Sequence, residues 1–107
     1  MINAIRIAQL QEMLKEEPND IFLHYALGLE YAKAAEQYAL AEAQFLQVLL
    51  RDENYVAAHY QLGQLYELWQ RAQEALAHYK AGQTKAKALG NRKAANEFEE
   101  AIFLLED

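Results

Sequence analysis

The stretch His24-Tyr-Ala-Leu-Gly-Leu-Glu-Tyr31 recurs thirty-five residues later as His59-Tyr-Gln-Leu-Gly-Gln-Leu-Tyr66. The His, the Leu-Gly pair and both Tyr residues keep their places in the two copies. Self-similarity at a fixed spacing of this size is typical of arrays in which each helical unit buries its apolar face against the next. The sequence therefore predicts a repeat protein, whose function must be sought on a surface.

The segment that follows each copy repeats as well. Ala41 and Phe45 after the first copy correspond to Ala75 and Tyr79 after the second, at a spacing of thirty-four. The difference of one residue between the two spacings predicts a single insertion in the turn around residues 36–37. Both helix faces then stay in register.

Two glycines lie in the interior of predicted helices, at Gly28 and Gly63. Glycine costs about 1 kcal/mol relative to alanine in a helix interior. That cost is offset if a second helix must approach closely, and Ala41 and Ala75 are the small residues predicted on the returning helices. We therefore expect two tight helix crossings, with aromatic residues filling the space beside them.

The rest of the chain carries helix signals and no convincing strand pattern. Apolar residues recur three and four apart, and the 107 residues contain one Pro and four Gly. We predict six helices, which cover about residues 2–16, 20–34, 38–51, 54–69, 72–89 and 91–106. Asn19 or Asp20, Asn54 and Asn91 are the predicted N-terminal caps, and Gly90 suits a left-handed helix end. Because the turns are short, neighbouring helices should be antiparallel.

The composition restricts the classes of function. The chain has no Cys, so disulfides and thiolate metal sites are excluded. Its net charge of -6 argues against binding nucleic acid or anionic lipid, although half of the basic residues lie between Lys80 and Lys93. The N-terminal sequence resembles neither a signal peptide nor a membrane span. We expect a cytoplasmic protein with no membrane association.

The repeated residues resemble the tetratricopeptide repeat (TPR) pattern of Leu-Gly and Tyr in a first helix, then Ala and an aromatic four residues on in a second. The resemblance implies an all-α, right-handed superhelical array of antiparallel helix pairs that forms one domain over residues 1–107. Its parts would be an N-terminal half-unit helix (1–19), repeat 1 (20–54), repeat 2 (55–89) and a C-terminal capping helix (90–107). The match departs from the pattern at His24 and His59, which replace an aromatic, and at Glu53, where Pro is usual.

The resemblance also implies a function, because TPR arrays mostly bind proteins or peptides in the groove lined by their first helices. Residues of the first helices that lie beside their buried apolar face would line this groove. They are Phe22, Tyr25, Leu29 and Lys33 in the first unit, Ala57, Tyr60, Gln64 and Glu67 in the second, and Arg92, Asn96 and Glu99 in the cap. Arg92 and Lys93 would be available for an acidic residue of the partner. The alternative is that the aromatic members only fill gaps between helices.

Catalysis finds little support in the sequence. His24 and His59 occupy equivalent places, and Glu74 and His78 share a helix face at a spacing of four. No metalloprotease, phosphate-loop or catalytic-triad motif accompanies them. We therefore expect packed histidines, with no catalytic residue, no metal and no cofactor.

Self-association is the rival function. The segment Ile102-Phe103-Leu104-Leu105 is apolar on more faces than a helix needs in order to pack against a single neighbour. Ile2 and Ile5 likewise lie outside the apolar face that the first helix is expected to bury. Terminal helices of an array need polar outer faces to remain monomeric. A homodimer through Ile2, Ile5, Ile102 and Phe103 is therefore an alternative to, and compatible with, groove binding.

Overall fold

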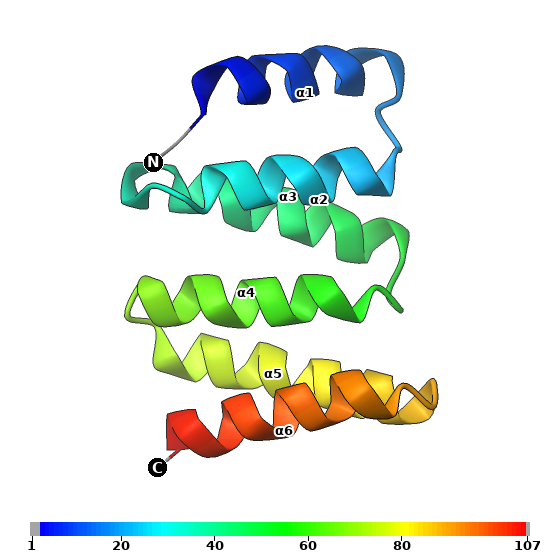
Figure 1. Cartoon of the computed structure of the whole chain (residues 1–107), viewed down its shortest axis with the longest axis vertical. Helices are drawn as coiled ribbons and strands as arrows, with labels where there is room; N and C mark the ends of the chain where they lie inside the picture. Colours follow the sequence, from blue (N-terminus) through cyan, green and yellow to red (C-terminus); the bar gives the residue numbers. More distant parts are fainter. Residues whose placement is uncertain (1–2, 107) are drawn as a thin grey trace. The chain divides into compact units, whose positions relative to one another are not determined.

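The structure, a computed structural model, describes residues 3–106. Within that range the regular elements are all helical (Figure 1). They are α1 (Ala4–Glu16), α2 (Ile21–Tyr31), a short 3-10 helix η1 (Ala35–Gln37), α3 (Tyr38–Arg51), α4 (Val56–Leu68), α5 (Ala72–Ala88) and α6 (Arg92–Glu106). The all-α helical repeat fold predicted from the sequence is confirmed.

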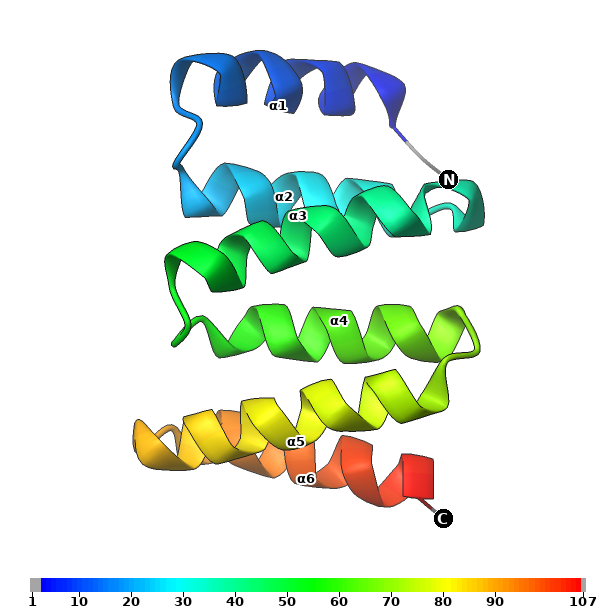
Figure 2. The same ribbon diagram turned by 180° about the vertical axis from the view of Figure 1, so that it is seen from behind.

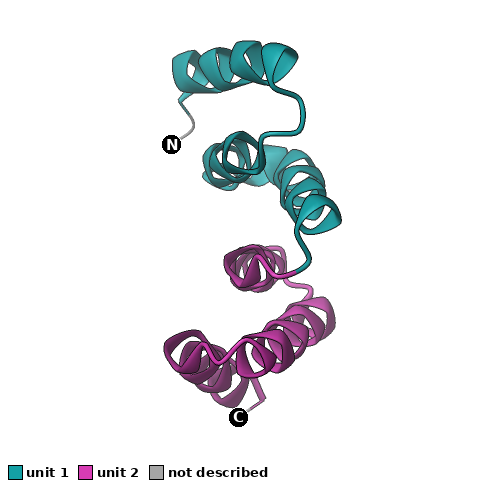
Figure 3. Cartoon of the chain, turned by 90° about the vertical axis from the view of Figure 1, so that its right-hand side faces the viewer, with its two compact units in different colours: residues 1–53 teal, residues 54–107 magenta. Residues whose placement is uncertain are grey.

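The helices group into two compact units, Met1–Glu53 and Asn54–Asp107 (Figure 3). In the first unit α2 packs against both α1 and α3. In the second unit α5 packs against both α4 and α6, as the views from either side show (Figures 1 and 2). Because α5 runs back against both neighbours, α4 and α6 run in the same direction.

Side-chain caps fix three of the helix starts. Asn3 accepts a hydrogen bond from the backbone N–H of Arg6 at 3.0 Å, and Asp20 and Asn91 do the same for the residues three positions on, both at 3.1 Å. The predicted caps at Asp20 and Asn91 are thus confirmed. Residue Ile2, with which the first helix was predicted to begin, lies outside the described residues.

The predicted cap of the fourth helix is wrong. Its N-terminal cap position is Tyr55, which makes no side-chain capping bond, and the helix begins at Val56. The N–H of Val56 donates to the backbone carbonyl of Asn54 at 2.9 Å. This turn delays the helix by one residue, so Asn54 lies one position too early to cap it.

The turn that holds the predicted insertion adopts its own structure. Helix α2 ends at Tyr31, earlier than the predicted residue 34, and η1 follows directly before α3. The N–H of Gln37 donates to the carbonyl of Ala34 at 3.0 Å. The extra residue is therefore absorbed in a 3-10 turn, which leaves the faces of α2 and α3 undisturbed.

The crossings of α2 with α3 and of α4 with α5 are each built from a glycine and an aromatic ring. A Cβ placed on Gly28 would lie 2.6 Å from Cε1 of Phe45, and a Cβ on Gly63 would overlap the ring of Tyr79. The predicted close approaches are confirmed, but rings and not alanines meet the glycines. Ala41 and Ala75 are fully buried beside them.

A third crossing of this kind joins α5 to α6, where a Cβ on Gly82 would overlap the ring of Phe98. The position of Gly82 fixes how α6 is rotated on α5, because Phe98 must point at it.

Candidate functional site

A groove runs between α4 and α6 in the second unit, and both of these helices pack against α5. One part of it is a cavity of about 390 Å³ lined by Tyr60, Gln64, Glu67, Glu97, Glu100, Ala101 and Leu104. A second cavity of about 300 Å³ shares Tyr60 and Glu97 with the first and continues toward the start of both helices, along Val56, Ala57, Gln61, Asn91, Ala94 and Phe98. We call these two cavities together the α4/α6 groove.

Aromatic packing holds the floor of the α4/α6 groove. The half-buried ring of Tyr60 lies 5.7 Å from the ring of Tyr79 and 5.6 Å from that of Phe98, measured between centroids. Contacts of this geometry stabilise the pairs beyond the area that they bury. Tyr60 therefore has a fixed position, with part of its surface open to the groove.

A polar network lies beside this aromatic floor. The hydroxyl of Tyr79 donates a hydrogen bond to the carboxylate of Glu67 and accepts one from the amide of Gln64 at 3.4 Å. Burial, and next the bond to Glu67, raise the pKa of Tyr79 well above its usual value. The phenol thus stays protonated and keeps donating to Glu67, which orients that carboxylate on the wall of the groove.

The predicted groove residues of α4 line the α4/α6 groove, whereas those of α6 lie outside it. Tyr60, Gln64 and Glu67 line one cavity. Arg92 and Asn96 instead line a different cavity of about 320 Å³ with Lys87, Gly90 and Ala95. Glu99 lines neither.

The α6 residues that the sequence missed are Glu97, Glu100, Ala101 and Leu104. With 3.6 residues per turn, Glu97, Ala101 and Leu104 lie on one side of Phe98, and Arg92 and Glu99 lie on the other. Phe98 is the buried residue of α6 whose ring packs against Gly82 of α5. Which flank of it faces α4 depends on the Gly82 crossing, and the repeat pattern does not contain that information.

In the first unit the predicted residues form a strip along α2. Phe22 is 66% exposed, and Tyr25 and Leu29 are half-buried. The ring of Tyr25 packs edge-on against Phe45 at a centroid distance of 5.8 Å. These three residues present an apolar face, which we call the α2 strip.

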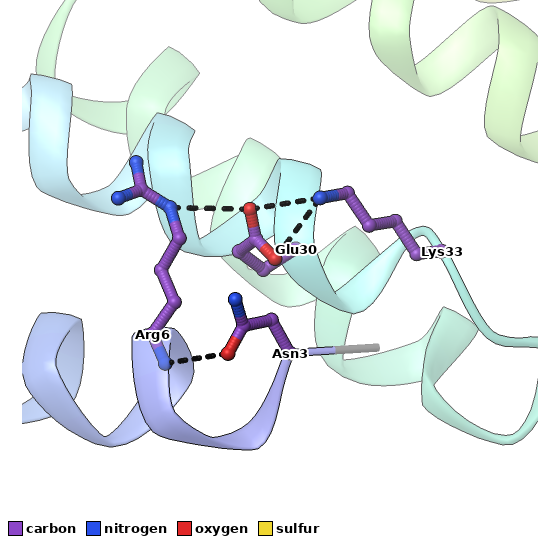
Figure 4. A network of polar contacts seen from close by, with 4 residues as sticks. All are labelled: Asn3, Arg6, Glu30 and Lys33. Atoms are coloured by element: carbon purple, nitrogen blue, oxygen red, sulfur yellow. Dashed lines mark hydrogen bonds and ion pairs between the residues drawn. The ribbon is translucent and has the colours of Figure 1, made fainter. Parts of the chain in front are cut away.

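Lys33, the fourth residue predicted there, is engaged in an ion pair. Its Nζ lies 3.1 Å from the carboxylate of Glu30, whose side chain is only 8% exposed. The same carboxylate accepts a hydrogen bond from Nε of Arg6 in α1 at 3.2 Å (Figure 4). Lys33 therefore neutralises a buried charge, and this role competes with binding a partner.

The residues of the predicted dimer surface differ in exposure. Ile5 on α1 is 74% exposed and Phe103 on α6 is 68% exposed, while Ile102 is half-buried. Ile2 lies outside the described residues.

The histidines are packed among other groups. Both ring nitrogens of His24 have partners, the carbonyl of Pro18 at 2.8 Å and the amide of Gln44 at 2.7 Å. Nδ1 of His59 lies 3.1 Å from Nδ1 of His78. Burial, then the nearby His78 and Lys85, lower the pKa of His59 to about 4, so this imidazole is neutral near pH 7.

Neither a metal cluster nor a membrane span is found in the part of the chain that the structure describes. Across residues 3–106, no three His, Cys, Asp or Glu side chains are grouped so that they could ligate one ion. Over the same range no helix has the length and apolar character to cross a bilayer.

Comparison with known proteins connects this fold to a family. No protein-family model and no curated protein matches the chain. Among solved structures, a solution structure of a tetratricopeptide repeat domain protein from Salinibacter ruber is 34% identical, with 83% of this chain and 89% of that one covered and a TM-score of 0.76. A crystal structure of a tetratricopeptide repeat domain protein from the same organism is 33% identical over 81% of this chain and 97% of that one, with a TM-score of 0.71.

A third match concerns the fold alone. The solution structure of a protein from Bordetella parapertussis has a TM-score of 0.82 at 23% identity, and covers 99% of this chain and 90% of its own. The two Salinibacter proteins share more than the fold with this chain, because the sequence identity of each to this chain extends over most of both chains. Together with the repeated Leu-Gly and Tyr positions, this identity shows that the chain belongs to the tetratricopeptide repeat family.

Proposed function

We propose that this protein is a non-catalytic interaction module that binds a peptide or helix of a partner protein in the α4/α6 groove. Helical repeat modules of this family typically serve in protein-protein interaction. The inference from family to function is an analogy, so it needs support from the site itself.

The observation that carries the proposal is the composition of the α4/α6 groove. Leu104 is 66% exposed at its edge and Tyr60 lies on its floor, next to the convergent polar groups of Gln64 and Glu67. Apolar surface with a few oriented polar groups is the usual make-up of a binding site. Rigid aromatic residues such as Tyr60 also dominate the energy of many interfaces.

The α2 strip of the first unit is a second proposed contact surface. The exposed ring of Phe22 and the half-buried Tyr25 and Leu29 offer apolar area there. A Phe22→Ala variant removes the exposed ring without touching the packed Tyr25, and it tests this surface separately.

A displayed library of random peptides, selected on the full chain, tests the proposed groove. Selected peptides should bind Leu104→Ala at least about tenfold more weakly than wild type, the scale of a moderate interface residue. Leu50→Ala is the matched control, because Leu50 on α3 is 77% exposed and lies outside the groove. Equal binding by the Leu104→Ala variant and wild type would reject the α4/α6 groove as the site.

Self-association through the terminal helices is the alternative function that a specific observation favours. Ile5 and Phe103 are large apolar side chains that are 74% and 68% exposed. Surface of this kind often marks an interface. Sedimentation at increasing protein concentration should then detect a dimer that Phe103→Glu dissociates, and a monomer at every concentration would reject this alternative.

A further inference from the structure

We propose that the α4/α6 groove selects a cationic partner segment, in which Lys or Arg residues flank an apolar one. This inference rests on the proposed function, since it names the chemistry of the partner that the groove would bind. It reverses the expectation from the sequence, in which Arg92 and Lys93 were to meet an acidic residue.

Carboxylates project into the groove from both of its walls. Glu67 comes from α4, and Glu97 and Glu100 come from α6. The residues that line this cavity include no Lys or Arg. In the described range 3–106, none of the ion pairs within 4 Å engages any of the three carboxylates.

Three basic side chains of the same unit are placed outside the groove. Lys87 and Arg92 line the separate cavity at the turn between α5 and α6. Lys80 pairs with Glu106 at 3.2 Å. These three cations therefore leave the charge of the α4/α6 groove in place, and a concave surface lined by one sign of charge concentrates its field.

The helix direction adds to this negative potential. Because α4 and α6 run in the same direction, their C-terminal ends lie at the same end of the groove (Figure 1). Glu67 and Leu104 both belong to the last turns of their helices. The C-terminal end of a helix carries partial negative charge, which favours cations.

The groove offers more than charge. Tyr60, Ala101 and Leu104 supply apolar surface between the carboxylates, and Leu104 is 66% exposed. The hydroxyl of Tyr79 already orients the Glu67 carboxylate, so this acceptor loses little freedom when it binds a donor. An apolar side chain flanked by Lys or Arg is complementary to both features.

Three synthetic peptides of about 16 residues, long enough to form a helix, test the charge preference. They share a row of Leu residues at helical spacing and carry Lys, Gln or Glu at the flanking positions. Fluorescence anisotropy on the full chain should give the Lys peptide a Kd about tenfold lower than that of the Gln peptide, with the Glu peptide weaker again. The preference should shrink between about 50 mM and about 500 mM salt.

A charge-matched pair of variants locates the effect. Glu97→Gln with Glu100→Gln removes two charges from the groove, and Glu16→Gln with Glu36→Gln removes two from exposed positions outside it. Only the first pair should abolish the preference for Lys. Equal binding of the Lys and Gln peptides, or the same loss in both pairs, would overturn the inference.

The failure of this inference can be distinguished from failure of the proposed function. If library peptides depend on Leu104 but the Lys peptide shows no advantage, the groove binds a partner of other chemistry, and only the inference falls. If no library peptide depends on Leu104, the proposed function falls as well. A dimer of the chain that Glu97→Gln with Glu100→Gln dissociates would identify a second copy as the occupant and would also overturn the inference.

Discussion

The aromatic ring of Phe45 in α3 lies directly against the backbone of Gly28 in α2. A Cβ at position 28 would come within 2.6 to 2.9 Å of three ring carbons, closer than carbon atoms pack. Both residues are buried, and the ring is fully so. The glycine in the repeated Leu-Gly pair is thus a steric requirement of the neighbouring ring.

Gly28→Ala should destabilise the protein by up to about 2 kcal/mol, because overpacking a core costs about 1–3 kcal/mol and the better helix propensity of alanine offsets only about 1 kcal/mol of that cost. Urea unfolding measures this free energy. In a Phe45→Leu background the same change should cost little or become stabilising, because the ring carbons that clash are gone. An equal loss in both backgrounds would show that the ring is not the cause.

Gln70→Gly should stabilise the protein by about 1 kcal/mol, because only glycine adopts a left-handed conformation without steric cost. Gln70 follows the end of α4 and has a φ of 59°. Gly90 occupies the equivalent position after α5 and has a φ of 73°. The two turns share the same pair of closing backbone hydrogen bonds. Gly90→Ala is the converse control and should destabilise, since its Cβ would meet open space and the backbone alone is strained. Thermal unfolding of both variants measures these changes in stability. An unchanged melting temperature for Gln70→Gly would show that the backbone at Gln70 is not strained.

Arg6→Met should lower the free energy of unfolding by about 0.5–1 kcal/mol, because it takes one of two cations from the buried carboxylate of Glu30 while keeping the aliphatic stem. Lys15→Met is the matched control in α1. The pair of Lys15 with Glu12 has side chains 74% and 65% exposed, so its loss should cost almost nothing. Equal losses in the two variants would mean that burial of Glu30 adds nothing to the strength of its pairing.

The His59 and His78 pair should make stability depend on pH. His59 has a pKa of about 4 when folded and 6.5 as a free side chain, so below pH 6.5 the unfolded chain binds a proton that the folded chain does not. The contribution of His59 to stability is therefore fully present above pH 6.5 and is lost as the pH decreases toward about 4. His59→Gln should remove this part of the dependence of the unfolding free energy on pH and leave the part that comes from the carboxylates. Parallel curves of unfolding free energy against pH for wild type and variant would contradict the lowered pKa.

Much of the fold is predictable because helix packing repeats. The Leu-Gly and Tyr positions indicate which faces meet, and α3 spans the predicted residues Tyr38–Arg51. The end of α2 and the start of α4 differ from prediction because local backbone turns decide them, through the hydrogen bonds of Lys33 N–H to Glu30 and of Val56 N–H to Asn54. Such bonds leave no periodic trace in a sequence.

The candidate site is only half predictable, for a related reason. Tyr60, Gln64 and Glu67 follow from the repeat, because α4 belongs to a complete unit. The α6 wall depends on which flank of Phe98 faces α4, and α6 lacks the Leu-Gly pair that would reveal it. The contact of Phe98 with Gly82 settles the rotation only in three dimensions.

Chemical-shift mapping of an isotope-labelled chain titrated with a library-selected peptide tests most directly whether the peptide binds in the α4/α6 groove. We expect the largest backbone shifts at Gln64, Glu97, Ala101 and Leu104, which line the α4/α6 groove. Shifts concentrated on exposed residues of α5, such as Gln73 and Ala77, with the groove unaffected, would contradict this expectation.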